Sequence, residues 1–450
     1  MNFELDKQTI QDLEIFGNGK SSNNLIHYYN YTKTIGSKKH LYGLMRSPLT
    51  DIAELQQRRD AMKFIYDIEF ELTINSGQFD FIERYLNLNI SVLRNNFLDA
   101  YIQSISNKLK PLNDYYLIQS GIKQLIFLFR HLDEKLKSLV DFTLPEGIVH
   151  HIREIQEFFR NQDIRKIITS KEKISCVRLN KFDNLIRKKC KKEVVEIIRI
   201  VYILDAYSSI AKAARINKFA FPEYLNESKP KLKITGLFHP FLENAVPYNI
   251  TFDQTKNLCF LTGPNMAGKS TFLKSVGISI YLSHLGFPVP ATRMETTIYN
   301  GIISTINLSD NMSRGYSHFY SEVKRVKETA LMIKEKRNLF VIFDELFRGT
   351  NVKDAFDASL LILKSFAKIT NCTFYISTHI TEVAEEIKNI SSIQFMYFDS
   401  KLVNDQPICN YKLLSGVSHE RLGMLILKNE KIIDILDSIS ETDDCQSDYL

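Results

Sequence analysis

The cysteines of this sequence show no close pairing. Its six cysteines are scattered along the chain and no two form a CxxC motif: Cys176, Cys190, Cys259, Cys372, Cys409 and Cys445. Ligands of a structural zinc site recur at short spacing, and a disulfide framework is typical of small, cysteine-rich secreted chains. The spacing therefore argues against both and favours reduced, mostly buried thiols.

A long apolar run is missing as well. The longest candidate, residues 194–207, is interrupted by Arg199 and Asp205, whereas a membrane span needs about 18 apolar residues in sequence. The first 16 residues, MNFELDKQTIQDLEIF, carry acidic side chains where a signal peptide would be basic and then apolar. A net charge of +6 over 450 residues is too small to indicate a nucleic-acid partner by itself. We expect a soluble, cytoplasmic protein without a membrane partner.

The first half of the chain has few glycines and little β-branched alternation, whereas the second half has a strand-like pattern. Residues 1–220 are predicted to be all-α, with helices over 51–68, 90–110, 115–140, 149–168 and 182–214. A turn-rich segment, 221–235, is the predicted linker. Residues 236–450 alternate short apolar runs with helical segments, which predicts a three-layer α/β domain. Its expected strands are 248–252, 258–261, 296–305, 339–343, 373–377 and 393–398, with 395–398 and 408–414 forming an antiparallel hairpin.

A phosphate-binding loop is the strongest motif. The segment 259–275, CFLTGPNMAGKSTFLKS, places a short apolar strand before a glycine-rich turn and an amphipathic helix after it. Backbone N–H groups of such a turn surround a polyphosphate, and the helix adds the positive end of its dipole. Strand and helix in this order argue against a chance Gly/Lys turn. The predicted nucleotide-binding residues are Gly263, Pro264, Asn265, Met266, Ala267, Gly268, Lys269, Ser270 and Thr271.

A second motif supplies two carboxylates. The apolar run 339–343 ends in Asp344 and Glu345, at the strand end where ligands bind in open α/β sheets. Asp344 and the Ser270 hydroxyl are predicted to hold Mg²⁺, the one metal expected, while Glu345 orients or deprotonates the attacking water. A solvated acidic turn is the alternative interpretation. Adjacent strand residues point in opposite directions, which suits two separate roles.

Two further residues have weaker motifs. His379 follows another apolar strand, 373–377, and is either a structural histidine or a sensor of the γ-phosphate. Ser317 opens a helix expected to run to about residue 336, and is either a helix N-cap or a group that binds the γ-phosphate of a partner subunit. The basic run Arg187–Lys192 is either a solvated helix face or a patch for nucleic acid or another acidic partner.

Taken together, these motifs resemble the MutS family of ABC-type ATPases. TGPNMAGKST (262–271) is similar to the family's phosphate loop, and FDELFRGTNVKDAFDAS (343–359) to its Walker B and D-loop. STH (377–379) looks like its histidine switch and SHFYSE (317–322) its signature helix. LDKQTIQDLEIF (5–16) and the stretch 32–65 resemble the start of its lever domain.

The resemblance implies a multidomain protein with an all-helical lever and shortened clamp over 1–220 and an ABC-type P-loop NTPase domain over 236–450, ending in C-terminal dimerisation helices. It implies an Mg²⁺-dependent ATPase that forms a head-to-tail homodimer, binds DNA by structure rather than sequence and is associated with mismatch repair. This sequence begins at the lever domain, carries Ala245 in place of an adenine-stacking aromatic and has Phe347 in place of a D-loop glycine. We therefore keep open a nucleotide-gated clamp on branched DNA or ribosomes; a P-loop kinase is disfavoured by Glu345 and Ser317.

Overall fold

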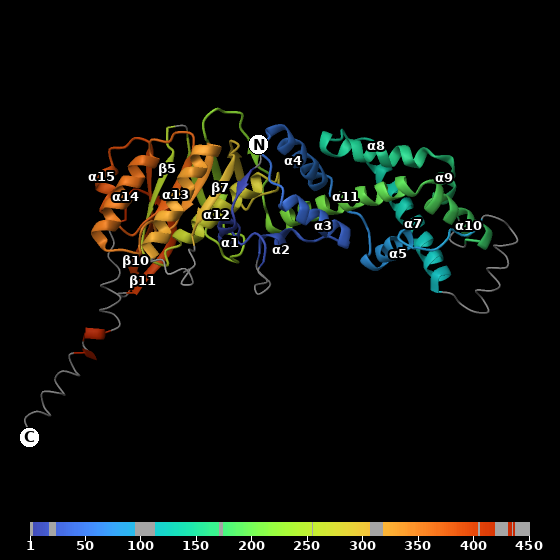
Figure 1. The fold of residues 1–450 in the computed structure, drawn as a ribbon, viewed down its shortest axis with the longest axis horizontal. Helices are drawn as coiled ribbons and strands as arrows, with labels where there is room; N and C mark the ends of the chain where they lie inside the picture. Colours follow the sequence, from blue (N-terminus) through green and yellow to red (C-terminus); the bar gives the residue numbers. More distant parts are fainter. Residues whose placement is uncertain are drawn as a thin grey trace, which may run out of the picture.

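The computed structural model describes residues 3–17, 24–94, 113–170, 174–253, 255–306, 318–403 and 406–418, with 431–433 and 435–436. The molecule is an elongated, mixed α/β protein, with a helical arm at one end and strands at the other (Figure 1). None of the described helices combines the length and apolar character that a membrane span requires.

The helical arm is organised around one long helix, α11 (Lys191–Asn217), which contacts α2, α3, α4 and α8. Polar caps set several helix starts; Asp51, for example, accepts hydrogen bonds from the N–H groups of Ala53 and Glu54 at 2.8 and 3.0 Å. The other helices of this half are α1 (Lys7–Asp12), α2 (Leu25–Tyr29), α3 (Ile35–Met45), α4 (Ile52–Asp67), α5 (Ser76–Leu86), α7 (Asn113–Ser138), α8 (Glu146–Arg160), α9 (Gln162–Ile168), α10 (Cys176–Asn184) and the π-helix η1 (Leu185–Lys189).

The main sheet has the strand order β1-β7-β8-β9-β5-β10-β11, parallel except for the final β10–β11 pair. Parallel strands are usually covered on both faces, and β5, β7, β8 and β9 are buried along their whole length. Its strands are β1 (Glu4–Leu5), β5 (Leu258–Thr262), β7 (Gly301–Thr305), β8 (Leu339–Phe343), β9 (Thr373–Ser377), β10 (Ile393–Val403) and β11 (Gln406–Ser415).

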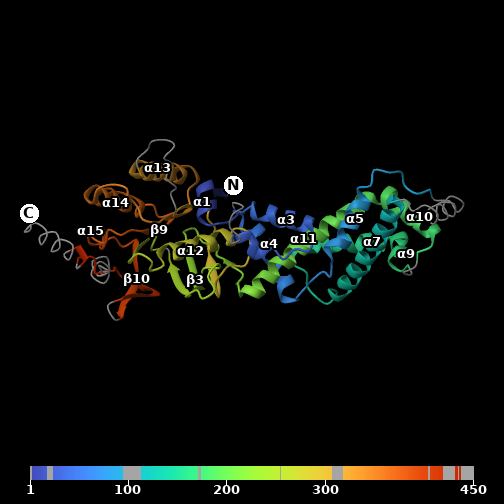
Figure 2. The same ribbon diagram turned by 90° about the horizontal axis from the view of Figure 1, so that it is seen from below.

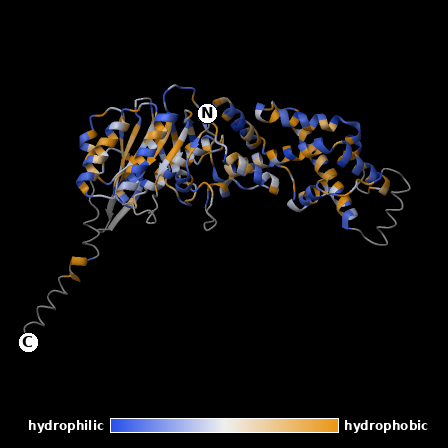
Figure 3. Ribbon diagram, in the orientation of Figure 1, coloured by the Kyte–Doolittle hydropathy of each residue, from blue (hydrophilic) through white to orange (hydrophobic). Residues whose placement is uncertain are grey.

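A second, smaller sheet has the order β2-β6-β3-β4, built from β2 (Glu223–Tyr224), β6 (Arg293–Thr296), β3 (Leu232–Leu237) and β4 (Tyr248–Phe252). Side chains of β5 alternate between two hydrophobic clusters. Cys259 and Leu261 face the cluster of α12 (Lys269–Ser283), whereas Leu258 and Phe260 face that of α13 (His318–Lys336), α14 (Val352–Phe366) and α15 (Val383–Ile387). The main sheet is therefore packed between these two groups of helices (Figures 2 and 3).

Most expected elements agree with the structure to within a few residues, including the strands 248–252, 339–343 and 373–377 and the β10–β11 hairpin. Two long segments are interrupted. The expected helix 149–168 is divided into α8 and α9 because the extended Asn161 caps the second helix, accepting hydrogen bonds from Asp163 and Ile164. The expected helix 182–214 passes through η1 and breaks at Cys190.

Three expectations about strands were wrong. The segment 296–305 is two strands in different sheets, β6 and β7, because the chain leaves one sheet at Thr296 and joins the other at Gly301. The region 1–220 is not wholly α, since β1 pairs with β7 at the edge of the main sheet. The expected linker 221–235 contains β2 and the start of β3. Most of the expected helix 90–110 and of the C-terminal helices lies outside the described residues.

Candidate nucleotide site

The loop between β5 and α12 has the backbone of a phosphate cradle. Gly263, Met266 and Gly268 all adopt positive φ, at 140°, 63° and 102°, and a Cβ on Gly263 would lie 3.1 Å from the Cβ of Phe398. Gly268 caps α12 without a side-chain hydrogen bond, so no side chain competes for the amides of the first turn. These amides and the helix dipole can therefore face an anion.

Lys269 lies inside this loop. Its Nζ donates hydrogen bonds to the carbonyl oxygens of Gly263 and Pro264 at 2.9 and 3.0 Å, and the residue is only 5% exposed. Burial lowers the pKa of its ammonium group, against which the nearby carboxylates of Asp344 and Glu345 act. A buried ammonium held by two neutral carbonyls would gain from an anionic partner.

Ser270 and Asp344, the two residues predicted to hold Mg²⁺, lie in contact with each other. The Ser270 hydroxyl donates a hydrogen bond to Asp344 Oδ2, so a hydroxyl and a carboxylate oxygen face one another beside the loop. The described residues contain no group of three or more His, Cys, Asp or Glu side chains that could hold a metal alone. The Ser270 hydroxyl and the Asp344 carboxylate are oxygen donors of the kind that Mg²⁺ takes, since this ion is usually bound by one or two protein oxygens together with phosphates and water.

Glu345 and His379 also lie together. His379 Nε2 is 2.6 Å from Glu345 Oε1, and Arg348 Nη1 donates to Glu345 Oε2 at 2.6 Å. The hydrogen bond with His379, aided by Arg348, lowers the pKa of the Glu345 carboxyl to about 2. Glu345 itself adopts a positive φ of 58°, a strained conformation that is common at functional sites. A carboxylate of such low basicity is better suited to orienting water than to removing its proton.

Ser377 connects the Asp344 carboxylate to the backbone of Glu345, a role the sequence reasoning did not assign. Its hydroxyl donates to Asp344 Oδ1 and accepts the backbone N–H of Glu345 at 2.9 Å. The parallel register of β8 and β9, which pairs Phe343 with Ile376, brings the two strand ends side by side. The order of neighbours in the sheet, rather than any local motif, therefore creates this contact.

A cavity of about 880 Å³ opens beside the loop. Lys269, Ser270, Glu345 and Arg348 line one part of it, and Ala245 and Tyr411 line another. Tyr411 was not predicted: it lies on β11 with a φ of 54° and is 45% exposed. It provides an aromatic ring in the cavity where Ala245 cannot, and only its place in the folded hairpin shows this.

The segment after Glu345 packs against the start of α13. Phe347, at a φ of 56° and 3% exposed, contacts the ring of Phe319 with centroids 5.6 Å apart. A Cβ on Gly349 would lie 2.6 Å from the Cβ of His318, so only glycine fits there. The described part of α13 begins at His318, and the predicted Ser317 lies outside the described residues.

The basic run of the arm divides into two groups. Arg187 is buried, and its Nε and Nη2 donate to the two Asp183 oxygens at 2.6 and 2.7 Å. Lys188, Lys189, Lys191 and Lys192 are exposed. Arg187 therefore cannot belong to a phosphate-binding surface, which corrects one part of the sequence interpretation.

Comparison with known proteins finds matches over this part of the chain. A family model described as MutS domain V matches residues 259–441. The chain is 25% identical over 416 residues to the DNA mismatch repair protein MutS of Petrotoga mobilis, covering 86% of this chain and 49% of that protein. It is 28% identical over 269 residues to the MutS of Thermotoga maritima, covering 58% of this chain and 33% of the relative.

A third relative is the DNA mismatch repair protein spellchecker 1 of Drosophila melanogaster, 28% identical over 233 residues, which cover 50% of this chain and 25% of that protein. The chain thus spans about half or less of the length of these relatives. The domain V match covers the phosphate loop, both carboxylates and His379, and the alignment with the Petrotoga mobilis protein, over 86% of this chain, extends into the helical arm as well. The chain is therefore similar to MutS proteins over most of its length, and its residues 259–441 match domain V of that family.

Proposed function

We propose that this protein is an Mg²⁺-dependent ATPase. The observation that supports the proposal most is the convergence of three strand ends: Lys269, Ser270 and Glu345 line one cavity, Asp344 contacts Ser270, and His379 contacts Glu345. Each has a side-chain type and position suited to one part of phosphoryl transfer: phosphate binding, metal binding, water orientation and γ-phosphate sensing.

Each of these site residues has its own proposed task in the reaction. Lys269 would exchange its two loop carbonyls for the β- and γ-phosphates, and Ser270 and Asp344 would hold Mg²⁺, which supplies positive charge for the transferred group. Glu345 orients the attacking water after Arg348 and His379 release one of its oxygens. Because Arg348 and His379 now hold both oxygens, the described arrangement is a resting one.

We further propose that the active form is a head-to-tail homodimer in which Ser317 of one subunit completes the site of the other. Met266, in the phosphate loop itself, is 92% exposed, which supports an open face that a second subunit could cover. Ser317→Ala should then lower ATPase activity while leaving the nucleotide affinity of a single site intact. Mixing Ser317→Ala with Lys269→Ala subunits should give dimers with at most one competent site. A rate per subunit that stays constant on dilution to clear monomers would contradict the composite site.

The proposed consequence of hydrolysis is movement of the helical arms on DNA, with a role in mismatch repair. The names of the relatives, which describe DNA mismatch repair proteins, support it. The direct test measures ATPase rates with paired, mismatched, branched and single-stranded DNA and with ribosomes. Stimulation by DNA supports the proposal, and stimulation by branched DNA or ribosomes alone favours the alternative of a nucleotide-gated clamp. No response to any of them would contradict coupling to either partner.

Adenine recognition is proposed to depend on Tyr411. Its ring lines the cavity together with Ala245 and Val246, and stacking on an aromatic ring contributes roughly 1–3 kcal/mol per base in nucleic-acid complexes. Tyr411 would thereby replace the aromatic absent at position 245.

A further inference from the structure

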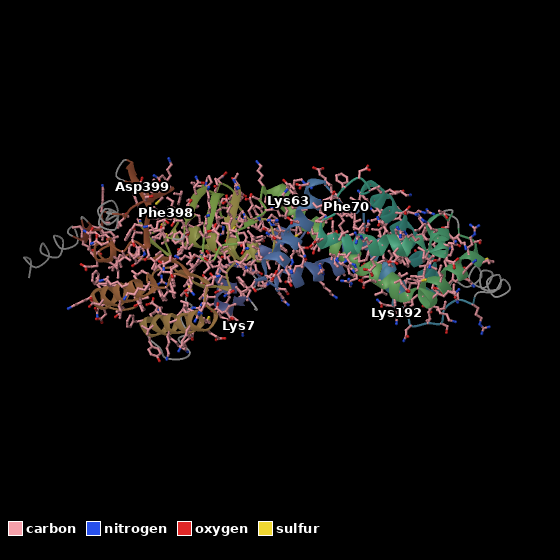
Figure 4. All side chains as sticks on the ribbon, turned by 90° about the horizontal axis from the view of Figure 1, so that it is seen from above. Lys7, Lys63, Phe70, Lys192, Phe398 and Asp399 are labelled. Atoms are coloured by element: carbon pink, nitrogen blue, oxygen red, sulfur yellow. The ribbon has the colours of Figure 1, made fainter. Side chains whose placement is uncertain are left out.

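The helical arm contains a second cavity, far from the phosphate loop. It has a volume of about 430 Å³ and lies between α9, α10 and η1. This size falls within the roughly 300–1,000 Å³ of small-ligand sites. Lys192, near this region, and Phe398, beside the phosphate loop, lie in opposite halves of the molecule (Figure 4).

Positive charge dominates the lining of this cavity. Lys166, Arg178, Lys181 and Lys189 contribute to it, whereas Asp163 is the one carboxylate among the described residues that line it. Lys166 pairs with Asp163 at 2.8 Å. Arg178, Lys181 and Lys189 form no ion pair with any carboxylate in the part of the chain that the structure describes. Three cations around one hollow, with a single carboxylate among the described residues that line it, repel one another, and an anion bound between them would lower this repulsion.

Asp163 responds to this surplus of charge. The hydrogen bond from Lys166 is the main cause that lowers the pKa of its carboxyl, and the charges of Lys181 and Lys189 act in the same direction. One carboxylate is thus influenced by three lysines from three different elements, α9, α10 and η1.

The walls of the cavity are held in place by contacts outside it. Arg130, on α7, donates to the carbonyl oxygens of Ile168 and Ser170, with 2.7 Å to Ile168, and fixes the end of α9. Phe182 and Leu185, 6% and 8% exposed, provide a buried apolar base. The apolar base and the anchored end of α9 therefore require little ordering when a ligand binds, whereas Arg178, Lys181 and Lys189 are exposed.

The π-helix η1 gives Lys189 its position. The Cys190 N–H donates to the Leu185 carbonyl at 2.8 Å, the wide turn of a π-helix. Within this turn Arg187 points inward to Asp183 while Lys189 lines the cavity. Such π-helical insertions are rare and occur frequently at functional sites.

We propose that this cavity binds a phosphate group. A phosphate carries negative charge that can pair with the three cations. The Arg178 guanidinium can donate hydrogen bonds to two of its oxygens. The group could come from a small phosphorylated compound or from a nucleic-acid backbone, which share this chemistry. The proposal does not depend on ATP hydrolysis at the other site.

The test compares two double variants that lose the same charge from the same region. Arg178→Gln with Lys189→Gln removes two cations from the cavity, whereas Lys188→Gln with Lys192→Gln removes two exposed lysines that do not line it. Both are made in the full chain in a Lys269→Ala background, so that the phosphate loop contributes little. Binding of sodium pyrophosphate is measured by calorimetry and binding of a 20-base-pair duplex by fluorescence anisotropy. Thermal unfolding checks that each variant is folded. If the cavity double variant does not fold, the single variants Lys181→Gln and Lys189→Gln replace it.

The cavity variant should weaken binding roughly tenfold or more, as expected for lost charge-assisted hydrogen bonds, while the control variant changes it little. A loss confined to pyrophosphate identifies a small phosphorylated ligand, and a loss that includes the duplex identifies a nucleic-acid phosphate. Equal affinities of the cavity and control variants in both assays would overturn the proposal. ATPase activity without DNA, measured with Lys269 intact, should be the same in both.

Discussion

Phe347 is a bulky residue in a backbone conformation that favours glycine, so backbone strain and side-chain packing oppose each other at this position. Its φ is 56° and its side chain is 3% exposed, packed on Phe319. Phe347→Gly would remove the backbone strain and the ring together. Two opposing effects therefore decide the sign of the change in stability.

The loss of packing should dominate. Removing a buried phenylalanine ring costs about 3–5 kcal/mol, and the greater freedom of glycine in the unfolded chain adds roughly 0.5–1 kcal/mol. Relief of the left-handed conformation returns about 1–2 kcal/mol. We therefore expect Phe347→Gly to lower the free energy of unfolding by about 1.5–5 kcal/mol. Phe347→Leu keeps both the φ and an apolar side chain, and should cost less than about 1.5 kcal/mol.

Thermal unfolding of the two variants beside the wild type measures this order. For a domain of 150–250 residues each kcal/mol corresponds to about 2–4 °C, so Phe347→Gly should unfold at a temperature roughly 3–20 °C lower. ATPase activity should fall as well, because Glu345 and Arg348 lie next to this turn. A Phe347→Gly protein as stable as the wild type, or more stable, would show that strain outweighs packing and refute the reasoning.

Three further predictions concern other parts of the molecule. Asp183→Asn leaves the buried Arg187 without its ion-pair partner and should destabilise the protein by about 3 kcal/mol or more in urea unfolding, whereas Lys188→Gln should change little; equal effects would contradict the division of the basic run. Burial lowers the pKa of His239 and His284 to about 4, below the model-peptide value of 6.5, so the unfolded chain binds more protons between these pH values. Stability should therefore be complete above pH 6.5 and decline as pH falls toward 4, by on the order of 1–2 kcal/mol per histidine at pH 5; an unchanged urea midpoint between pH 7.5 and 5 would count against it. Tyr411→Ala should weaken ATP binding roughly tenfold and Tyr411→Phe should not, as fluorescence titration can measure; equal affinities of both variants would exclude base stacking.

The phosphate loop and the strand ends could be predicted because their residues are close in sequence and their roles depend on local backbone. Gly263, Gly268 and Lys269 act within one turn, and Asp344 and Glu345 directly follow a buried strand. The contacts of Ser377, Arg348 and Tyr411 could not be predicted in the same way. Ser377 reaches Asp344 because β8 and β9 are neighbours in the sheet, and Tyr411 reaches the cavity through the β10–β11 hairpin.

The roles of the charged residues in the helical arm could not be predicted from local sequence either. A run of five basic residues within six positions appears uniform in sequence, yet the π-helix turns Arg187 toward Asp183 and Lys189 toward the second cavity. Nothing in the local composition distinguishes the two. Their partners, Asp183 and the residues of α9, depend on how the helices pack.

The central claim, that this site hydrolyses ATP with water held by Glu345, is tested most directly by single-turnover hydrolysis in Glu345→Gln. The amide keeps the size of the side chain and loses its charge, so ATP affinity should be retained while turnover falls on the order of 10²-fold or more. Lys269→Ala in the same assay should instead weaken nucleotide binding. A Glu345→Gln protein that hydrolyses Mg·ATP at the wild-type rate would remove Glu345 from the mechanism and contradict the account.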